Sequence, residues 1–243
     1  MTKDIILIIG ASSDIGLNLI NNISDEALII AHYNSSNERL LELSKNISNE
    51  LVTLKADLSK EEEISKLLDT IESDHGIPNT IVHLAANKVE NIRFKDVTWS
   101  DFEKDINISF KSAILILNRF LPKLSKLRKG KVVIMLSSYV LGVPPKALTH
   151  YTTIKYAMLG LVKSLASEYS NKNIQVNAVS PSMIDTKFLD NINEKFVELN
   201  AYNHPLKRNA TVEDITPVIK LLISTESDYM NGINIPVTGG SIF

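Results

Sequence analysis

The chain has 243 residues, of which 44% are hydrophobic and 22% charged, and it contains no cysteine. This length and apolar content fit one globular α/β domain and exclude an intrinsically disordered chain. A net charge of −2 argues against a nucleic-acid partner, and the lack of cysteine excludes thiol catalysis and Cys-ligated zinc. No apolar run reaches the roughly 20 residues that a membrane helix needs, so we expect a cytoplasmic protein that does not enter the membrane.

Short apolar runs alternate with amphipathic stretches of helical length along the whole chain. Strands are expected at Asp4–Ile9, Ala27–Ala31, Leu51–Leu54, Thr80–Leu84, Lys131–Leu136, Ile174–Val179 and Ile233–Val237. Helices are expected at Ile15–Ile23, Asn37–Ile47, Glu61–Glu72, Trp99–Leu121, Tyr151–Tyr169 and Val212–Leu222. This order predicts a single-domain, doubly wound Rossmann fold over residues 1–243, with a seven-stranded parallel sheet flanked by helices.

The connection that follows the strand Ile174–Val179 is longer than the other connections between expected strands and helices. The segment from Ser180 to Thr211 contains two prolines and a helical stretch around Lys187–Asn200. Connections of this length in compact α/β domains are often lids or substrate loops. We therefore expect a substrate loop or lid at about residues 182–210.

A glycine-containing loop follows the first strand and opens the first helix. Glycines there permit a tight turn and a close approach of the backbone to a pyrophosphate, which the helix N-terminus then faces. Asp14 either brings a negative charge close to that phosphate site or caps the helix and points away. The loop residues expected to contact a dinucleotide are Gly10, Ser12, Ser13, Asp14, Ile15 and Gly16.

The end of the second strand carries no carboxylate. NAD enzymes often have Asp or Glu there to bind the adenosine ribose, whereas this chain has His32, Tyr33 and Asn34. A neutral polar cradle leaves room for the 2′-phosphate of NADP(H). The preference over NAD(H) is slight, because Arg39 is the nearest cation and Asp14 would oppose the phosphate.

Tyr151 and Lys155 stand four residues apart, which places a phenol and an ammonium on one face of a helix. A cation beside a tyrosine stabilises the phenolate and lowers its pKa from the usual value of about 10. Ser138 follows the strand Lys131–Leu136, thirteen residues before Tyr151. Strand carboxyl ends bind ligands in such sheets, so Ser138 is placed to reach a carbonyl oxygen.

With these motifs, the chain resembles the short-chain dehydrogenase/reductase family nearly end to end, and most of all its 3-oxoacyl-carrier-protein reductases and related carbonyl reductases. The resemblance implies that Tyr151 exchanges a proton with the carbonyl oxygen, that Lys155 binds the nicotinamide ribose, and that Ser138 orients the substrate. It also implies dimers or tetramers. The further functional residues it implies are a catalytic Asn107, adenine contacts from Asp57 and Leu58, a cofactor buttress at Ala85 and Ala86, and nicotinamide contacts from Pro181, Ile184 and Thr186.

Three positions depart from the family pattern. Asp14 replaces a glycine, His83–Ala86 replaces the common Asn-Asn-Ala-Gly, and Ser182 replaces a glycine after Pro181. None of them alters the proposed Ser-Tyr-Lys set.

The expected function is therefore NAD(P)(H)-dependent hydride transfer between nicotinamide and a carbonyl or secondary alcohol, with no metal. The leading hypothesis is a ketoreductase that acts on 3-oxoacyl thioesters, either free or bound to a carrier protein. The alternatives are a sugar or sugar-nucleotide dehydrogenase and a nucleotide-binding protein without catalysis; a Rossmann-like methyltransferase would leave Tyr151 and Lys155 without purpose. Specificity is expected to reside in Val140–Thr149 and Met183–Asn203.

Overall fold

A single seven-stranded sheet organises the computed structural model, which describes residues 3–23 and 26–242. All its pairings are parallel, in the order β3-β2-β1-β4-β5-β6-β7. The strands are β1 Asp4–Ile9, β2 Ala27–Tyr33, β3 Glu50–Lys55, β4 Thr80–His83, β5 Gly130–Met135, β6 Ile174–Pro181 and β7 Asn234–Val237. The predicted seven-stranded parallel sheet is confirmed.

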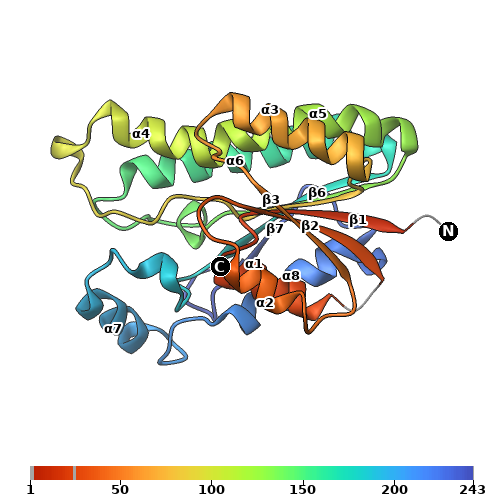
Figure 1. Ribbon diagram of the computed structural model, residues 1–243. Helices are drawn as coiled ribbons and strands as arrows, with labels where there is room; N and C mark the ends of the chain where they lie inside the picture. The colour runs from red at the N-terminus through yellow and green to blue at the C-terminus, as the bar shows by residue number, and fades with distance from the viewer. Residues whose placement is uncertain (1–2, 24–25, 243) are drawn as a thin grey trace.

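Helices cover both faces of the sheet (Figure 1). Their bounds are α1 Asp14–Asn22, α2 Glu38–Leu43, α3 Glu61–Thr70, α4 Trp99–Asp105, α5 Ser112–Leu127, α6 Thr149–Glu168, α7 Glu194–Asn203 and α8 Val212–Ile223. Helices α3, α5 and α6 bury one core, which includes Phe120 and Val162. Helices α1, α2 and α8 bury the other, which includes Ile20 and Ile219. The central strands lie between two apolar layers, which explains their unbroken apolar sequences.

The strand order reverses direction between β1 and β4. Strand β1 pairs in parallel with β2 on one side and with β4 on the other. Connections leave β1 and β4 toward opposite faces of the sheet, and this opens a crevice at their carboxyl ends. Figure 1 shows α7 beyond that end of the sheet. The fold thus brings the glycine loop and the long 182–210 connection together at this crevice.

The helix expected at Trp99–Leu121 is interrupted. Helix α4 ends at Asp105, a π-helical turn follows at Ile106–Lys111, and α5 continues to Leu127 through Pro122. At this junction the Ser112 hydroxyl donates to the carbonyl of Ile108 at 2.5 Å. Such a side-chain bond competes with the regular helical ladder, and π-turns are common at functional sites.

The helical stretch expected at Lys187–Asn200 is also divided. A 3₁₀ turn occupies Lys187–Leu189 and α7 begins only at Glu194, because the Asn193 side chain caps the helix by accepting from the Lys195 amide at 3.0 Å. Within the described residues, no helix is both long enough and apolar enough to cross a membrane.

Candidate active site

A pocket of about 1250 Å³ lies at the carboxyl ends of the strands. Its walls come from the glycine loop, the segments that follow β4, β5 and β6, and the 182–210 connection. This volume exceeds the roughly 300–1,000 Å³ of a site for one small ligand, so it has room for a dinucleotide together with a substrate. The residues that line it include Ser12, Ser13, Asp14, Ile15, Ala86, Tyr151, Lys155, Pro181, Ile184 and Thr186, all ten expected from the sequence.

The glycine loop is tightly packed against its surroundings. Gly10 has φ +80°, and a Cβ at this position would lie 3.1 Å from the backbone nitrogen of Ala85. At Gly16 a Cβ would lie 2.5 Å from the Ala11 carbonyl oxygen. The Ser13 hydroxyl accepts from the Gly16 amide at 3.1 Å and caps α1. The loop therefore brings bare backbone and a helix N-terminus to the pocket, which fits a dinucleotide pyrophosphate.

His32 supports this loop from inside the protein. Its Nδ1 accepts from the Gly10 amide at 3.2 Å, and its Nε2 lies 2.9 Å from the Ala56 carbonyl oxygen. Burial lowers the pKa of the imidazole, which keeps the ring neutral. His32 was expected to face the cofactor directly; in the structure it joins the loop to β2 and to the end of β3.

Asp14 neither caps α1 nor stands alone. Its carboxylate lies 2.7 Å from the Arg39 guanidinium and accepts from the Lys187 amide at 2.9 Å. Burial disfavours its charge, but the bonds from Lys187 and Arg39 outweigh that cost and hold the pKa of Asp14 below its usual value. Asp14 thus ties the glycine loop to the 182–210 connection and brings Arg39 to the pocket wall.

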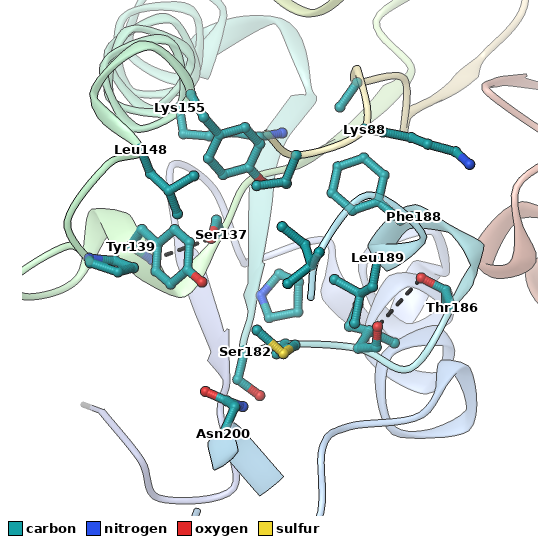
Figure 2. A pocket seen from close by; sticks show the side chains of 18 of the residues that line it. Lys88, Ser137, Tyr139, Leu148, Lys155, Ser182, Thr186, Phe188, Leu189 and Asn200 are labelled. Atoms are coloured by element: carbon teal, nitrogen blue, oxygen red, sulfur yellow. Dashed lines mark hydrogen bonds between the residues drawn. The ribbon is translucent and has the colours of Figure 1, made fainter. Parts of the chain in front are cut away.

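Tyr151 and Lys155 lie together on the first two turns of α6, as their spacing predicts. Lys155 donates to the Met135 carbonyl at 2.9 Å, and its Nζ stands 5.5 Å from the centre of the Tyr151 ring. Tyr139 meets Tyr151 edge-on, with ring centres 6.3 Å apart. Figure 2 shows Ser137, Tyr139 and Lys155 on one side of the pocket, facing Phe188 and Leu189.

The serine that lines the pocket beside this pair is Ser137. Residue Ser137 lines the pocket and acts to lower the pKa of the Tyr151 phenol, whereas Ser138 does not line the pocket. Ser137 also accepts from the Tyr139 amide at 3.3 Å, which fixes its side chain at the start of a 3₁₀ turn. The thirteen-residue interval had pointed to Ser138, but adjacent residues leaving a strand point in opposite directions, so only one of the two reaches the pocket.

Burial dominates the acid–base properties of the pair. It raises the pKa of Tyr151 well above the ordinary value, against the opposing hydrogen bond from Ser137. It also lowers the pKa of Lys155 to about 8. The expectation that the cation would leave Tyr151 with a depressed pKa is not met, because burial has the larger effect. The phenol is protonated at neutral pH, which is the form that a proton donor requires.

Several residues expected at the site lie outside the pocket lining. Asp57 accepts from the amide and hydroxyl of Ser59, at 3.0 and 2.7 Å, and Leu58 is part of the core. Asn107 lies half-buried in the π-helical turn. The others that do not line it are Gly10, Gly16, His32, Tyr33, Asn34 and Ala85.

The lining also includes residues that the motifs did not indicate. One group follows β4 and contains Lys88, Val89 and Phe94. Leu148 and the apolar residues Met183, Phe188, Leu189, Ile192, Phe196 and Leu199 come from the two segments in which specificity was expected. Nothing in a single sequence marks Lys88, Val89 and Phe94, because they belong to no motif and this part of the described chain forms only a short 3₁₀ turn at Phe94–Asp96. Among the described residues, no group of three or more His, Asp or Glu is placed to hold a metal.

A parallel sheet with a glycine loop at its switch point, and a buried Tyr-Lys pair opening on the same crevice, define a nicotinamide-dependent oxidoreductase. Residues 11–241 match the family model described as enoyl-(acyl carrier protein) reductase. The chain therefore belongs to that family, within the short-chain dehydrogenases/reductases.

Curated relatives match over nearly the full length. The 3-oxoacyl-[acyl-carrier-protein] reductase FabG of Buchnera aphidicola is 25% identical over 240 residues, covering 98% of this chain and 97% of the relative. The FabG of Staphylococcus aureus is 28% identical over 246 residues, covering 99% and 98%.

Solved structures share the fold. A 3-oxoacyl-[acyl-carrier protein] reductase from Brucella melitensis superposes with a TM-score of 0.88 at 21% identity, covering 98% of this chain and 91% of that one. The structure described as ElxO with NADP bound has a TM-score of 0.86 at 22% identity, covering 98% of each. At these identities the likeness concerns the fold.

Proposed function

We propose that this chain reduces the 3-oxo group of acyl thioesters with NADPH. The observation that carries the proposal is the protonated Tyr151 phenol, backed by Lys155 and sharing with Ser137 a pocket with apolar walls. Apolar walls favour an acyl chain over a sugar, whose hydroxyls would lose hydrogen bonds there. Curated relatives named 3-oxoacyl-[acyl-carrier-protein] reductase support the same substrate class.

The residues have distinct roles in this proposal. Tyr151 gives its proton to the carbonyl oxygen, and Ser137 donates a hydrogen bond to that oxygen as negative charge develops on it. Lys155 holds a positive charge behind the phenol. When bound, the nicotinamide supplies the hydride. The loop residues 12–15 would hold its pyrophosphate, and Pro181, Ile184 and Thr186 line the pocket where the nicotinamide end is expected.

NADPH is proposed over NADH for two reasons. The end of β2 presents no carboxylate to a ribose, and Arg39 lines the pocket as a partner for a 2′-phosphate. The relative with NADP bound supports this choice. Residues 182–210 serve as the lid, held to the glycine loop through Asp14 and Lys187 and to the segment after β4 through Lys88 and Asp190. A homodimer or homotetramer in the cytoplasm remains our expectation.

A substrate panel tests the proposal. Purified protein is assayed at 340 nm with NADPH or NADH and with acetoacetyl-CoA, crotonyl-CoA and a set of keto sugars. We expect the wild-type protein to oxidise NADPH when acetoacetyl-CoA is present. The Tyr151→Phe variant should lose this activity but still bind NADPH. Turnover of crotonyl-CoA alone would instead favour reduction of a carbon–carbon double bond, the activity that the family description names. Turnover of keto sugars alone would favour the sugar dehydrogenase alternative.

A further inference from the structure

A second, smaller cavity of about 230 Å³ reaches Tyr151 from outside the main pocket. Both cavities are lined by Tyr151, Lys88 and Val89. Unlike the main pocket, the smaller cavity is rich in ionisable side chains. Its remaining lining residues are Asn87, Glu90, Asp101, Lys104, Asp105 and His150.

Asp105 is the buried acid of this cavity, with 12% of its side-chain surface exposed. Asn87 donates to its Oδ1 at 2.9 Å, and the Nδ1 of His150 lies 3.8 Å from its Oδ2. His150 Nδ1 in turn accepts from the Tyr151 amide at 2.7 Å. The carboxylate at the end of α4 is therefore held by Asn87 and faces, without a hydrogen bond to His150, the first turn of α6, which carries Tyr151.

The proposed reaction uses neither Asp105 nor this cavity, and a buried acid without a partner cation in bonding contact is costly. Several charged or titratable groups face it. On α4 these are Asp101 and Lys104; after β4 they are Lys88 and Glu90; and on α6 they are His150, Tyr151 and Lys155. Burial raises the pKa of Asp105, while the hydrogen bond from Asn87 and the nearby positive charges favour its ionised form.

A negative charge at this point acts on both members of the Tyr-Lys pair. It raises the pKa of Lys155 against the larger effect of burial, and it adds to the effect of burial on Tyr151. Both effects favour protonated side chains, the state in which Tyr151 can donate to a carbonyl oxygen. The charge acts from the smaller cavity, so an acyl chain in the main pocket would leave it in place.

We propose that Asp105 is a positioning residue for proton transfer: its carboxylate, held by Asn87 and facing His150 in the smaller cavity that Tyr151 also lines, keeps Tyr151 and Lys155 protonated for carbonyl reduction. This inference rests on the proposed function. It assigns Asp105 no contact with the substrate and no bond to the reacting atoms.

The test is Asp105→Asn, which removes the charge and keeps an oxygen that can accept from Asn87. In the wild type, we expect kcat/KM for reduction to fall at alkaline pH as Lys155, with a pKa of about 8, deprotonates. We expect the variant to lose activity at a pH lower by about 0.5–1 unit, the scale of one nearby buried charge. Glu90→Gln is the matched control, because it removes an equal charge from the exposed rim of the same cavity, where solvent screens it.

A measurement without turnover separates this inference from the proposed function. The carbon-13 shift of the Lys155 side chain is titrated in lysine-labelled protein, with the signal assigned by its absence in Lys155→Arg. Asp105→Asn should lower the titration midpoint from about 8 by about 0.5–1 unit, and Glu90→Gln should leave it unchanged. Should Asp105→Asn fail to fold, Asn87→Ala keeps the carboxylate but removes its donor, and we expect a smaller shift in the same direction.

The inference is overturned if the folded variant shows the wild-type alkaline limb and the wild-type Lys155 midpoint. Equal shifts in Glu90→Gln would also overturn it, because the buried position of Asp105 would then have no special effect. Failure of the proposed function has a different signature: no carbonyl reduction by the wild type, whatever the Lys155 titration shows.

Discussion

Replacement of the serine beside Tyr151 offers a sharp test of the site, because two adjacent serines are available. Ser137 lines the pocket together with Tyr151, while Ser138 is equally buried but lies outside the lining. Ser137→Ala removes a donor to an oxygen on which charge develops. Such a bond is worth about 1.5–3 kcal/mol, which corresponds to a loss of about 10- to 150-fold in kcat/KM.

The assay is steady-state reduction of acetoacetyl-CoA, with Ser138→Ala as the control. We expect Ser138→Ala to retain kcat/KM to within about twofold, since a buried hydroxyl away from the reacting atoms affects stability rather than rate. Thermal unfolding of both variants checks that they remain folded. A large loss in Ser138→Ala together with a normal Ser137→Ala would refute the assignment of the site serine.

Three further predictions concern the cofactor loop and the core. Asp14→Asn removes the negative charge beside the phosphate site and releases Arg39, so NADPH should bind about three- to tenfold more tightly by fluorescence titration; weaker binding would contradict this role. Burial holds His83 neutral with a pKa of about 3, below its value of about 6.5 in the unfolded chain. The stability this provides is complete above pH 6.5 and is lost toward acid, at about 1.4 kcal/mol per pH unit. Urea unfolding at pH 6.5 and 5.5 should show this dependence in the wild type and a weaker one in His83→Asn, and identical slopes would exclude it. Phe120→Ala should lower the free energy of unfolding by about 3–5 kcal/mol because the ring is fully buried, whereas the exposed Leu127→Ala should change it little.

The layered fold follows from the sequence because buried parallel strands and amphipathic helices have different periods. Strand β1 has the predicted bounds, Asp4–Ile9. The π-helical turn at Ile106–Lys111 could not be foreseen, because its side-chain period differs little from that of an α-helix over one turn. The division of the lid helix depends on one capping side chain, Asn193.

The site was predictable where spacing determines geometry and unpredictable where orientation does. A spacing of four residues on a helix brings the side chains of Tyr151 and Lys155 onto one face, whatever surrounds them. Which of the two serines after β5 points into the pocket depends on the orientation of the last residues of the strand. The thirteen-residue interval to Tyr151 pointed to Ser138, whereas Ser137 lines the pocket. The partners of Asp14 lie 25 residues away at Arg39 and 173 residues away at Lys187, and no local pattern links them.

Hydride transfer to a 3-oxoacyl thioester tests the central claim most directly. NADPH deuterated at C4 of the nicotinamide is incubated with acetoacetyl-CoA and the wild-type protein, and the thioester product is analysed by mass spectrometry. The account predicts one deuterium at C3 of 3-hydroxybutyryl-CoA with the wild type and no such product with Tyr151→Phe. Unlabelled acetoacetyl-CoA recovered unchanged from a wild-type protein that binds NADPH would contradict it.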